Sequence, residues 1–215
     1  MQNTDTNIDT KTNDVDVDVL VDWEARYQAG TTGWDRGTSS ANLQRWLDSG
    51  LLQPCSILIP GCGNGYEVIE LAKAGFTVTA IDIAPTPVKQ LKHAINTQLD
   101  DSQGLRVTVL QADFFTYQPT QTFDAIYEQT SLCALSPAQW QTYAHCLQQW
   151  LKPNGQLFAQ FMQTGQTGGP PWHCPIDAMQ PLFPSTHWHW QTQLPHLAMR
   201  EHDPKFELPY LLVRR

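Results

Sequence analysis

The sequence predicts an α/β fold of the Rossmann-like kind: a mostly parallel sheet of seven strands, with helices on both faces and an antiparallel hairpin at the C-terminal end. Three observations lead to this prediction. Short apolar runs alternate with longer helical patterns, a glycine-rich turn follows the first apolar run, and an acidic residue closes the second. Strands of a parallel sheet are buried on both faces and are therefore short and apolar, while helices with a right-handed crossover connect them.

The parallel part of the sheet is expected to contain five strands. The apolar run Ile57-Leu58-Ile59 marks the first of them. The five are expected at 56–60, 76–81, 105–110, 123–128 and 156–162. Two further strands are expected at 187–193 and 208–214, and their spacing suits a terminal hairpin added to the edge of the sheet.

Helical patterns occupy the segments before and between these strands. They are expected at 22–29, 39–48, 66–74, 87–99, 137–151 and 177–183. Ser39 or Ser40 would cap the second helix, and Gly50 would end it. Gly75 would stop the third, and Pro153-Asn154-Gly155 would follow the end of the long one.

The charge of the chain is concentrated at its N-terminal end. The net charge is −8, and residues 1–22 hold six aspartates against one lysine. We therefore predict a flexible tail at 1–21, followed by a single domain at 22–215. No basic run occurs, so a small-molecule acceptor is favoured over nucleic acid.

Composition also indicates the compartment. The apolar runs are far too short to cross a bilayer, and the N-terminus does not resemble a secretory signal, so neither a membrane nor secretion is expected. The cysteines are odd in number and form no Cys-x-x-Cys pair, so disulfides and a zinc site are not expected. We therefore expect a cytoplasmic protein, and the absence of a coiled-coil pattern favours a monomer. No metal is expected, because His187 and His189 alternate on a strand but lack a third ligand.

The first candidate site is the turn Gly61-Cys62-Gly63-Asn64-Gly65, which lies between a strand and a helix. Glycine permits a tight turn and lets a ligand approach the backbone amides, which makes Gly61 and Gly63 candidate cofactor contacts. Asp82 closes the next strand, where a carboxylate can accept hydrogen bonds from two ribose hydroxyls.

Two ligand classes use such a turn: dinucleotides and S-adenosylmethionine. The spacing here is Gly-x-Gly-x-Gly, whereas dinucleotide enzymes carry Gly-x-Gly-x-x-Gly. After the third strand, Asp113 is placed to hold an adenine amino group and Phe114 to pack on the ring, while Glu128 ends the fourth strand. Carboxylates at the ends of consecutive strands suit a sulfonium amino acid and would repel a pyrophosphate. A nicotinamide-dependent reductase is accordingly the weaker alternative.

The chain resembles class I methyltransferases in its glycine turn and in Leu151-Lys152-Pro153-Asn154-Gly155. More narrowly, it resembles the thiopurine S-methyltransferase superfamily, and within it the branch of halide and thiol methyltransferases. The matching stretches are Asp22-Trp23-Glu24-Ala25-Arg26-Tyr27, Gly33-Trp34-Asp35-Arg36-Gly37, Ile59-Pro60-Gly61-Cys62-Gly63, Tyr127-Glu128-Gln129-Thr130-Ser131-Leu132-Cys133-Ala134-Leu135 and Gly168-Gly169-Pro170-Pro171-Trp172-His173.

This resemblance implies a class I fold and S-adenosylmethionine as the methyl donor, with S-adenosylhomocysteine as product. It implies that residues 22–50 form a helical cap over the cofactor, which holds Trp23, Tyr27 and Trp34, and it places Trp34 and Trp172 near the acceptor. The remaining implied cofactor contacts are Gly61, Asp82, Asp113, Phe114 and Gln129. Thiopurine enzymes carry leucine, glutamate and arginine in place of Gly61, Asp82 and Gln129, and relatives carry tyrosine or phenylalanine at Trp172. These departures count against a thiopurine acceptor.

A methyl group leaves a sulfonium by in-line displacement, which requires no metal and no covalent intermediate. Asp35 and His173 are candidate bases, but neither is required for a thiolate that is already ionised. We therefore expect a small thiol or another soft nucleophile as the acceptor. The alternatives are a halide, a selenium or tellurium compound, another small acceptor, or a module that binds S-adenosylmethionine without turning it over.

Overall fold

The structure is a computed structural model that describes residues 21–195, 197–198 and 204–215. The predicted tail at 1–21 falls almost entirely outside the described residues. The helices are α1 (Trp23–Gln28), α2 (Ala41–Asp48), α3 (Tyr66–Lys73), α4 (Pro85–Gln98), α5 (Asp101–Gly104), α6 (Ser131–Ala134), α7 (Pro137–Trp150) and α8 (Ile176–Leu182). The strands are β1 (Ser56–Pro60), β2 (Thr77–Asp82), β3 (Val107–Gln111), β4 (Phe123–Gln129), β5 (Leu151–Gln163), β6 (Trp188–Gln193), β7 (Leu197–Ala198) and β8 (Phe206–Arg214).

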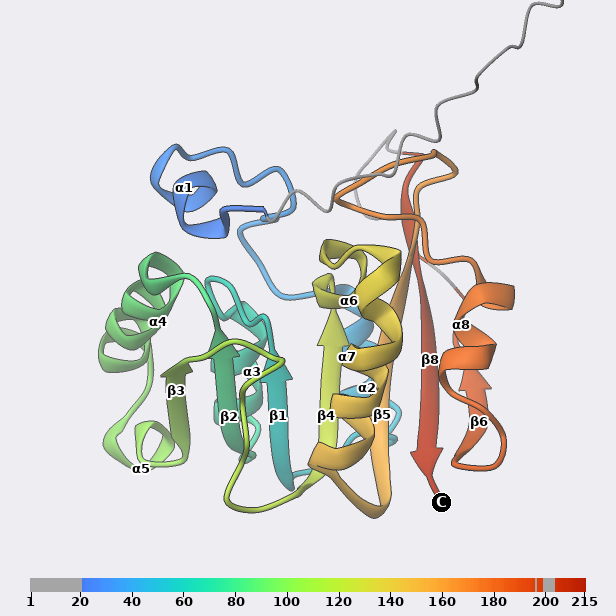
Figure 1. The fold of residues 1–215 in the computed structure, drawn as a ribbon. Helices are drawn as coiled ribbons and strands as arrows, with labels where there is room; N and C mark the ends of the chain where they lie inside the picture. The colour runs from blue at the N-terminus through green and yellow to red at the C-terminus, as the bar shows by residue number, and fades with distance from the viewer. Residues whose placement is uncertain (1–20, 196, 199–203) are drawn as a thin grey trace, which may run out of the picture.

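The predicted fold is confirmed. Within the described residues the sheet has the order β3-β2-β1-β4-β5-β8-β6, and β7 pairs with β8 to one side of this path. All pairings among β1 to β5 are parallel, whereas β8 runs antiparallel to β5 and to β6 (Figure 1). The terminal hairpin therefore joins the sheet edge through its second strand, so that β8 is an interior strand.

Helices cover both faces of the sheet, with α7 in front of it and α2 and α3 behind (Figure 1). The side chains of each strand alternate between these layers. On β1, Leu58 packs in the cluster that contains α7 and α8, while Ile57 and Ile59 pack in the cluster that contains α2, α3 and α4. All three are 5% exposed or less, which explains why this strand is a continuous apolar run rather than an alternating one.

The junction of α7 and β5 differs from the prediction. The helix ends at Trp150 and β5 begins at Leu151, so Pro153-Asn154-Gly155 lies within the first part of the strand. Its pairing with β4 is irregular there: Phe123 pairs with Leu151, but Ala125 pairs with Gln156. Asn154 has φ 62°. The turn-forming residues thus produce a bulge in the strand, because a bulge needs the same backbone freedom as a turn.

Three short elements were not anticipated: α5, α6 and β7. The first two span four residues each, too few for a helical period to appear in the sequence. The third pairs through two residues. No helix in the described part of the chain has the length and apolar character needed to span a membrane.

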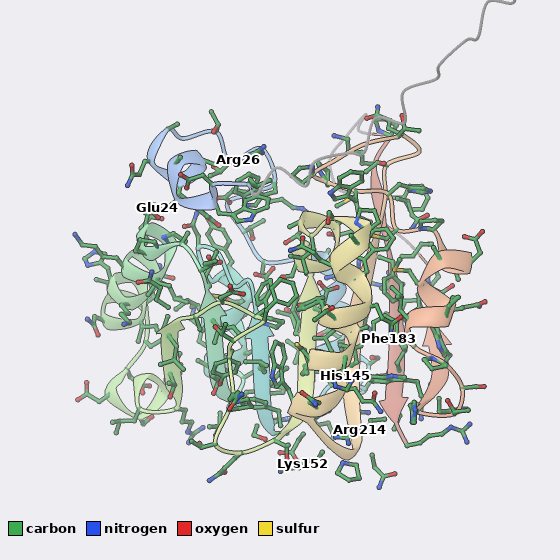
Figure 2. The ribbon with its side chains drawn as sticks, viewed as in Figure 1. Glu24, Arg26, His145, Lys152, Phe183 and Arg214 are labelled. Atoms are coloured by element: carbon green, nitrogen blue, oxygen red, sulfur yellow. The ribbon has the colours of Figure 1, made fainter. Side chains whose placement is uncertain are left out.

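A polar network fixes the start of three strands at the end of the sheet opposite α1. Asp124 on β4 accepts hydrogen bonds from the backbone N–H of Ser56 at 3.1 Å and from its hydroxyl at 2.6 Å. Lys152 on β5, labelled at that end in Figure 2, donates to the other carboxylate oxygen of Asp124 at 2.6 Å. Lys152 and the Ser56 hydroxyl hold the pKa of Asp124 below its ordinary value of 3.8.

We predict that Asp124→Asn lowers the free energy of unfolding by about 1 kcal/mol at pH 7, a small value because the ion pair is partly exposed. The pKa of Asp124 is lower in the folded state, so its carboxylate stabilises the fold above about pH 3.8 and loses this effect as the pH falls. Urea titrations of both proteins should therefore converge in acid. Asp101→Asn, on an exposed helix, is the control, and a difference that persisted in acid would contradict the prediction.

Candidate functional site

Two adjoining cavities lie at the carboxyl ends of β1, β2 and β4, beneath α1 and the segment that follows it. The larger has a volume of about 400 Å³ and the smaller about 90 Å³. Residues from the cap and from the ends of β1 and β4 line both of them: Tyr27, Trp34, Arg36, Gly61 and Thr130. The two cavities therefore form one continuous site with a wide and a narrow part.

The glycine turn brings the backbone against both cavities. Gly61 has φ +60°, and a Cβ at this position would meet the Ser131 hydroxyl and lie 3.2 Å from the Phe114 ring. The sequence requires glycine here both for the backbone conformation and for the close approach.

Asp82 ties the end of β2 to this turn. One carboxylate oxygen accepts a hydrogen bond from the Gly63 N–H and the other from the Ala84 N–H, each at 2.9 Å. Asp82 is 6% exposed and lines the larger cavity. Burial raises its pKa, and the hydrogen bonds from Ala84 and Gly63 oppose this shift. Because each oxygen has a second lone pair, the carboxylate can still accept hydrogen bonds from a ligand.

The structure separates the two residues that were expected to bind adenine. Phe114 lines the larger cavity, and its ring lies 5.0 Å from that of Tyr143. Asp113 is not among the residues that line either cavity. Its carboxylate accepts a hydrogen bond from the Phe115 N–H at 2.9 Å, so it holds the turn that presents Phe114.

The aromatic residues of the cap pack edge to face. The centroid of the Trp34 ring lies 5.3 Å from the ring centroid of Trp23 and 5.6 Å from that of Tyr27. All three line the larger cavity. Arg26 also lines it and lies over the Trp23 ring at 5.5 Å. The predicted cap residues are therefore brought together over the site.

Glu24 anchors α1 to the sheet domain. Figure 2 shows Glu24 on α1, above the carboxyl ends of the strands. Its carboxylate accepts hydrogen bonds from the Thr86 N–H at 2.9 Å and the Thr86 hydroxyl at 2.5 Å, in the first turn of α4. These hydrogen bonds lower the pKa of Glu24. A carboxylate at a helix N-terminus also interacts favourably with the helix dipole.

The far end of the larger cavity is mainly apolar. Cys133, Leu135, Met162, Pro170 and Pro171 line it. Trp172, which was expected here, is not among the lining residues. The backbone N–H of Trp172 donates to the Cys133 carbonyl at 2.7 Å, and the Trp172 ring packs against the core cluster next to Gly169. The two prolines before it form the wall in its place.

The two candidate bases occupy different places. Asp35 lines the smaller cavity, where its carboxylate accepts hydrogen bonds from the Asn64 amide at 2.5 Å and the Gly37 N–H at 2.7 Å. His173 lines neither cavity, and its Nδ1 accepts hydrogen bonds from the backbone N–H groups of Thr164 and Gly165. That nitrogen holds the loop, so it is not available as a base.

Glu128 is buried beneath the site. It is 1% exposed, lines neither cavity, and accepts a hydrogen bond from the Leu132 N–H of α6 at 2.7 Å. Burial raises its pKa to about 8. The structure therefore does not bring Glu128 into the position expected of a cofactor contact: it holds the short helix that follows β4.

Gln129 does line the smaller cavity, together with two residues that the sequence did not single out. Its amide oxygen accepts from the Tyr127 hydroxyl at 2.9 Å and its amide nitrogen donates to Glu207 at 3.2 Å. The two residues are Arg36 and Thr130, the latter with φ 63°. Both could have been found because they lie in stretches that carry the family resemblance: Arg36 lies between Gly33 and Gly37, and Thr130 directly follows Gln129.

Among the described residues, no group of three or more histidine, cysteine, aspartate or glutamate side chains could hold a metal ion.

Comparisons with known proteins agree with the geometry. The family model described as "Thiopurine S-methyltransferase (TPMT)" matches residues 20–207. The chain is 32% identical to "Probable thiol methyltransferase 2" of Arabidopsis thaliana over 75% of this chain and 70% of that protein. It is 27% identical to a thiopurine S-methyltransferase of Vibrio cholerae, over 75% and 79% of the two chains.

Solved structures of methyltransferases share the fold. The 1,6-didemethyltoxoflavin-N1-methyltransferase of Burkholderia thailandensis superposes with a TM-score of 0.70, at 17% identity, over 88% of this chain and 84% of that one. The magnesium protoporphyrin IX methyltransferase of Synechocystis superposes with a TM-score of 0.67, at 16% identity, over 81% and 80%. Both of those structures contain S-adenosylhomocysteine.

We predict that Glu128→Gln stabilises the protein at alkaline pH. Between pH 4.5 and about 8 the unfolded wild type loses this proton and the folded state keeps it, so the wild-type stability falls as the pH rises. Glutamine keeps the oxygen that accepts from Leu132 and removes the titration. Chemical unfolding at pH 5 and pH 8 should show an advantage of the variant that grows with pH. A constant difference would mean that Glu128 is ionised in the folded protein.

Proposed function

The chain belongs to the thiopurine S-methyltransferase family, and we propose that it transfers a methyl group from S-adenosylmethionine to a small thiol or another soft nucleophile. It is an S-adenosylmethionine-dependent methyltransferase with the class I fold. The observation that carries the proposal is the placement of Asp82, the glycine turn and the aromatic cap around one continuous site.

The residues present fit the donor. The larger cavity falls in the range of small-molecule sites, about 300–1,000 Å³. Asp82 offers acceptor lone pairs to ribose hydroxyls, and Phe114 offers an apolar face to adenine. The absence of a side chain at Gly61 lets Ser131 and Phe114, which both line the larger cavity, pack against the backbone of the turn. When bound, the donor supplies a methyl group on a sulfonium, which the acceptor displaces in line.

The cap residues Trp23, Tyr27 and Trp34 are proposed to lie over the sulfonium, because aromatic faces attract cations. Together they also exclude water from the reacting atoms, and Glu24 holds them in place through α4. Orientation and water exclusion supply the rate enhancement for a nucleophile that needs no base. The proposed contact set keeps Gly61, Gly63, Asp82, Phe114 and Gln129, and omits Asp113 and Glu128.

The acceptor end of the cavity supports a soft acceptor. Its wall is mainly apolar side chains and the thiol of Cys133; Lys205 also lines the cavity, and no histidine is among the described residues that line it. Burial raises the pKa of Cys133 far above its ordinary value, so this thiol is protonated and acts as part of the apolar wall. An acceptor oxygen or amine would require a positioned base. We further propose a cytoplasmic monomer acting on a small molecule, since all five cysteines are unpaired and the charge is acidic.

An acceptor screen with labelled S-adenosylmethionine tests the function. We expect methylated product with hydrogen sulfide or a small thiol. Asp82→Ala should weaken S-adenosylhomocysteine binding by about 1.5–3 kcal/mol, the scale of hydrogen bonds to a charged group. The same variant should also lower the rate of methyl transfer. The panel also contains iodide, selenium and tellurium oxyanions, thiopurines, alcohols and amines. Donor binding without product from any of them would identify a non-catalytic binding module, and activity on alcohols or amines alone would exclude a soft acceptor.

The apolar wall predicts how acceptor size is selected. Leu135→Ala should raise kcat/KM for a bulky aromatic thiol relative to hydrogen sulfide by about tenfold, because a wider pocket admits the ring and aligns a small acceptor less well. Trp172→Ala is the comparison, since its ring packs outside the cavity wall: it should slow both reactions to the same extent. The assignment of the wall fails if Trp172→Ala alters the ratio and Leu135→Ala does not.

A further inference from the structure

A buried carboxylate on the C-terminal strand reaches the smaller cavity from behind. Glu207 on β8 is 1% exposed. Its Oε2 lies 2.9 Å from Nη2 of Arg36, and the amide nitrogen of Gln129 donates to the same oxygen at 3.2 Å. Burial raises the pKa of Glu207, but Arg36 and Gln129 oppose this shift. A buried charge with these two partners is paired rather than isolated.

Both partners of Glu207 line the smaller cavity, but Glu207 itself does not. Arg36 comes from the cap and Gln129 from the end of β4, whereas Glu207 comes from the strand that pairs with β5. At Glu207 the backbone of β8 pairs with Met162 of β5 on one side and with Leu197 of β7 on the other, so the carboxylate has a fixed base. It therefore fixes the positions of the Arg36 and Gln129 side chains.

The smaller cavity lies where the amino-acid end of the donor must go. Phe114 and Asp82 line the larger cavity on the side of β2 and β3, where adenine and ribose are proposed to bind. A ligand held there extends its other end past Gly61 toward the end of β4, where the smaller cavity begins. That end of S-adenosylmethionine is a zwitterion, with one carboxylate and one ammonium group.

We propose that Glu207 is a positioning residue for the amino-acid end of the donor, acting through Arg36 and Gln129. The inference rests on the proposed donor. A guanidinium has five N–H donors in a fixed plane, so Arg36 can pair with Glu207 on one side and present further donors to the donor carboxylate on the other. Gln129 is held at both ends of its amide, by Tyr127 and Glu207, which fixes the direction of its oxygen and nitrogen.

The arrangement also connects two distant parts of the chain. Arg36 belongs to the segment between α1 and α2, and Glu207 to the last strand. The Arg36 side chain is largely buried where it meets Glu207, and the carboxylate offsets the cost of removing the guanidinium charge from water. The added antiparallel hairpin thus contributes to the site through Glu207, which lies behind the wall of the smaller cavity.

The test compares two ligands that differ only at the end in question. S-adenosylhomocysteine carries the amino-acid end, whereas 5′-methylthioadenosine keeps the adenosine and the sulfur and lacks it. Calorimetry should show that Glu207→Gln weakens S-adenosylhomocysteine binding by about tenfold or more, the scale of losing a charge-assisted contact. Binding of 5′-methylthioadenosine should change by less than about twofold, which also shows that the adenosine site remains folded.

A second variant and a control accompany this measurement. Arg36→Lys keeps the charge that Glu207 needs but loses the planar fork, and should show the same selective loss to a smaller degree. Glu70→Gln removes an exposed carboxylate that pairs with Lys73 and should leave both ligands unaffected. If the wild type bound S-adenosylhomocysteine and 5′-methylthioadenosine equally tightly, the amino-acid end would add nothing to binding, and the role proposed for Glu207 would be wrong.

The outcomes separate the inference from the function on which it rests. Equal losses for both ligands in Glu207→Gln would make Glu207 a general structural residue, and no loss for either would show that Arg36 and Gln129 do not depend on it. Either result overturns the inference and leaves the proposed function intact. A wild-type protein that bound neither ligand would overturn the proposed function and this inference together.

Discussion

The site depends on the hydrogen bond between the Gly63 N–H and the carboxylate of Asp82. Parallel pairing places β1 beside β2 in register, with Pro60 opposite Ile81, so the glycine turn after one strand meets the aspartate that ends the other. The turn then has a fixed conformation next to the cavity. The cap, the aromatic residues and the end of β4 are arranged around it, and each of them lines a cavity that Gly61 also lines.

Four carboxylates near the site differ in function because they differ in burial and in partners. Asp82 is buried at the cavity wall and accepts from two backbone N–H groups, which leaves acceptor capacity on the open side. Glu128 is buried below the wall and holds α6. Glu24 caps α4 from α1, and Glu207 pairs with Arg36. A carboxylate becomes a ligand contact, a helix anchor or an ion-pair partner according to what surrounds it.

The site also draws on all parts of the chain. The cap precedes the first strand, and the glycine turn and Asp82 come from the first half of the sheet. The apolar part of the larger cavity is lined by residues of α6, of β5 and of the loop at 168–171. Such an assembly suits methyl transfer, since a displacement that needs alignment and dryness gains from walls that close from several directions.

The sequence by itself determined the elements whose physical cause is local. Apolar runs specified the five parallel strands, and glycines and Asp82 specified the first turn of the site, whereas the cap around Trp23 and Trp34 was expected only from the family resemblance. Only the tertiary structure decided which side chains face the cavity. Arg36 and Thr130 line the two cavities, whereas four residues expected at the site do not: Asp113, Glu128, Trp172 and His173. The tertiary structure also paired Arg36 with Glu207, because β8 enters the sheet beside β5 and carries that carboxylate across 171 positions of sequence to the cap. Strand order and burial depend on contacts between distant segments, and a sequence pattern of period two or three records only which face is apolar.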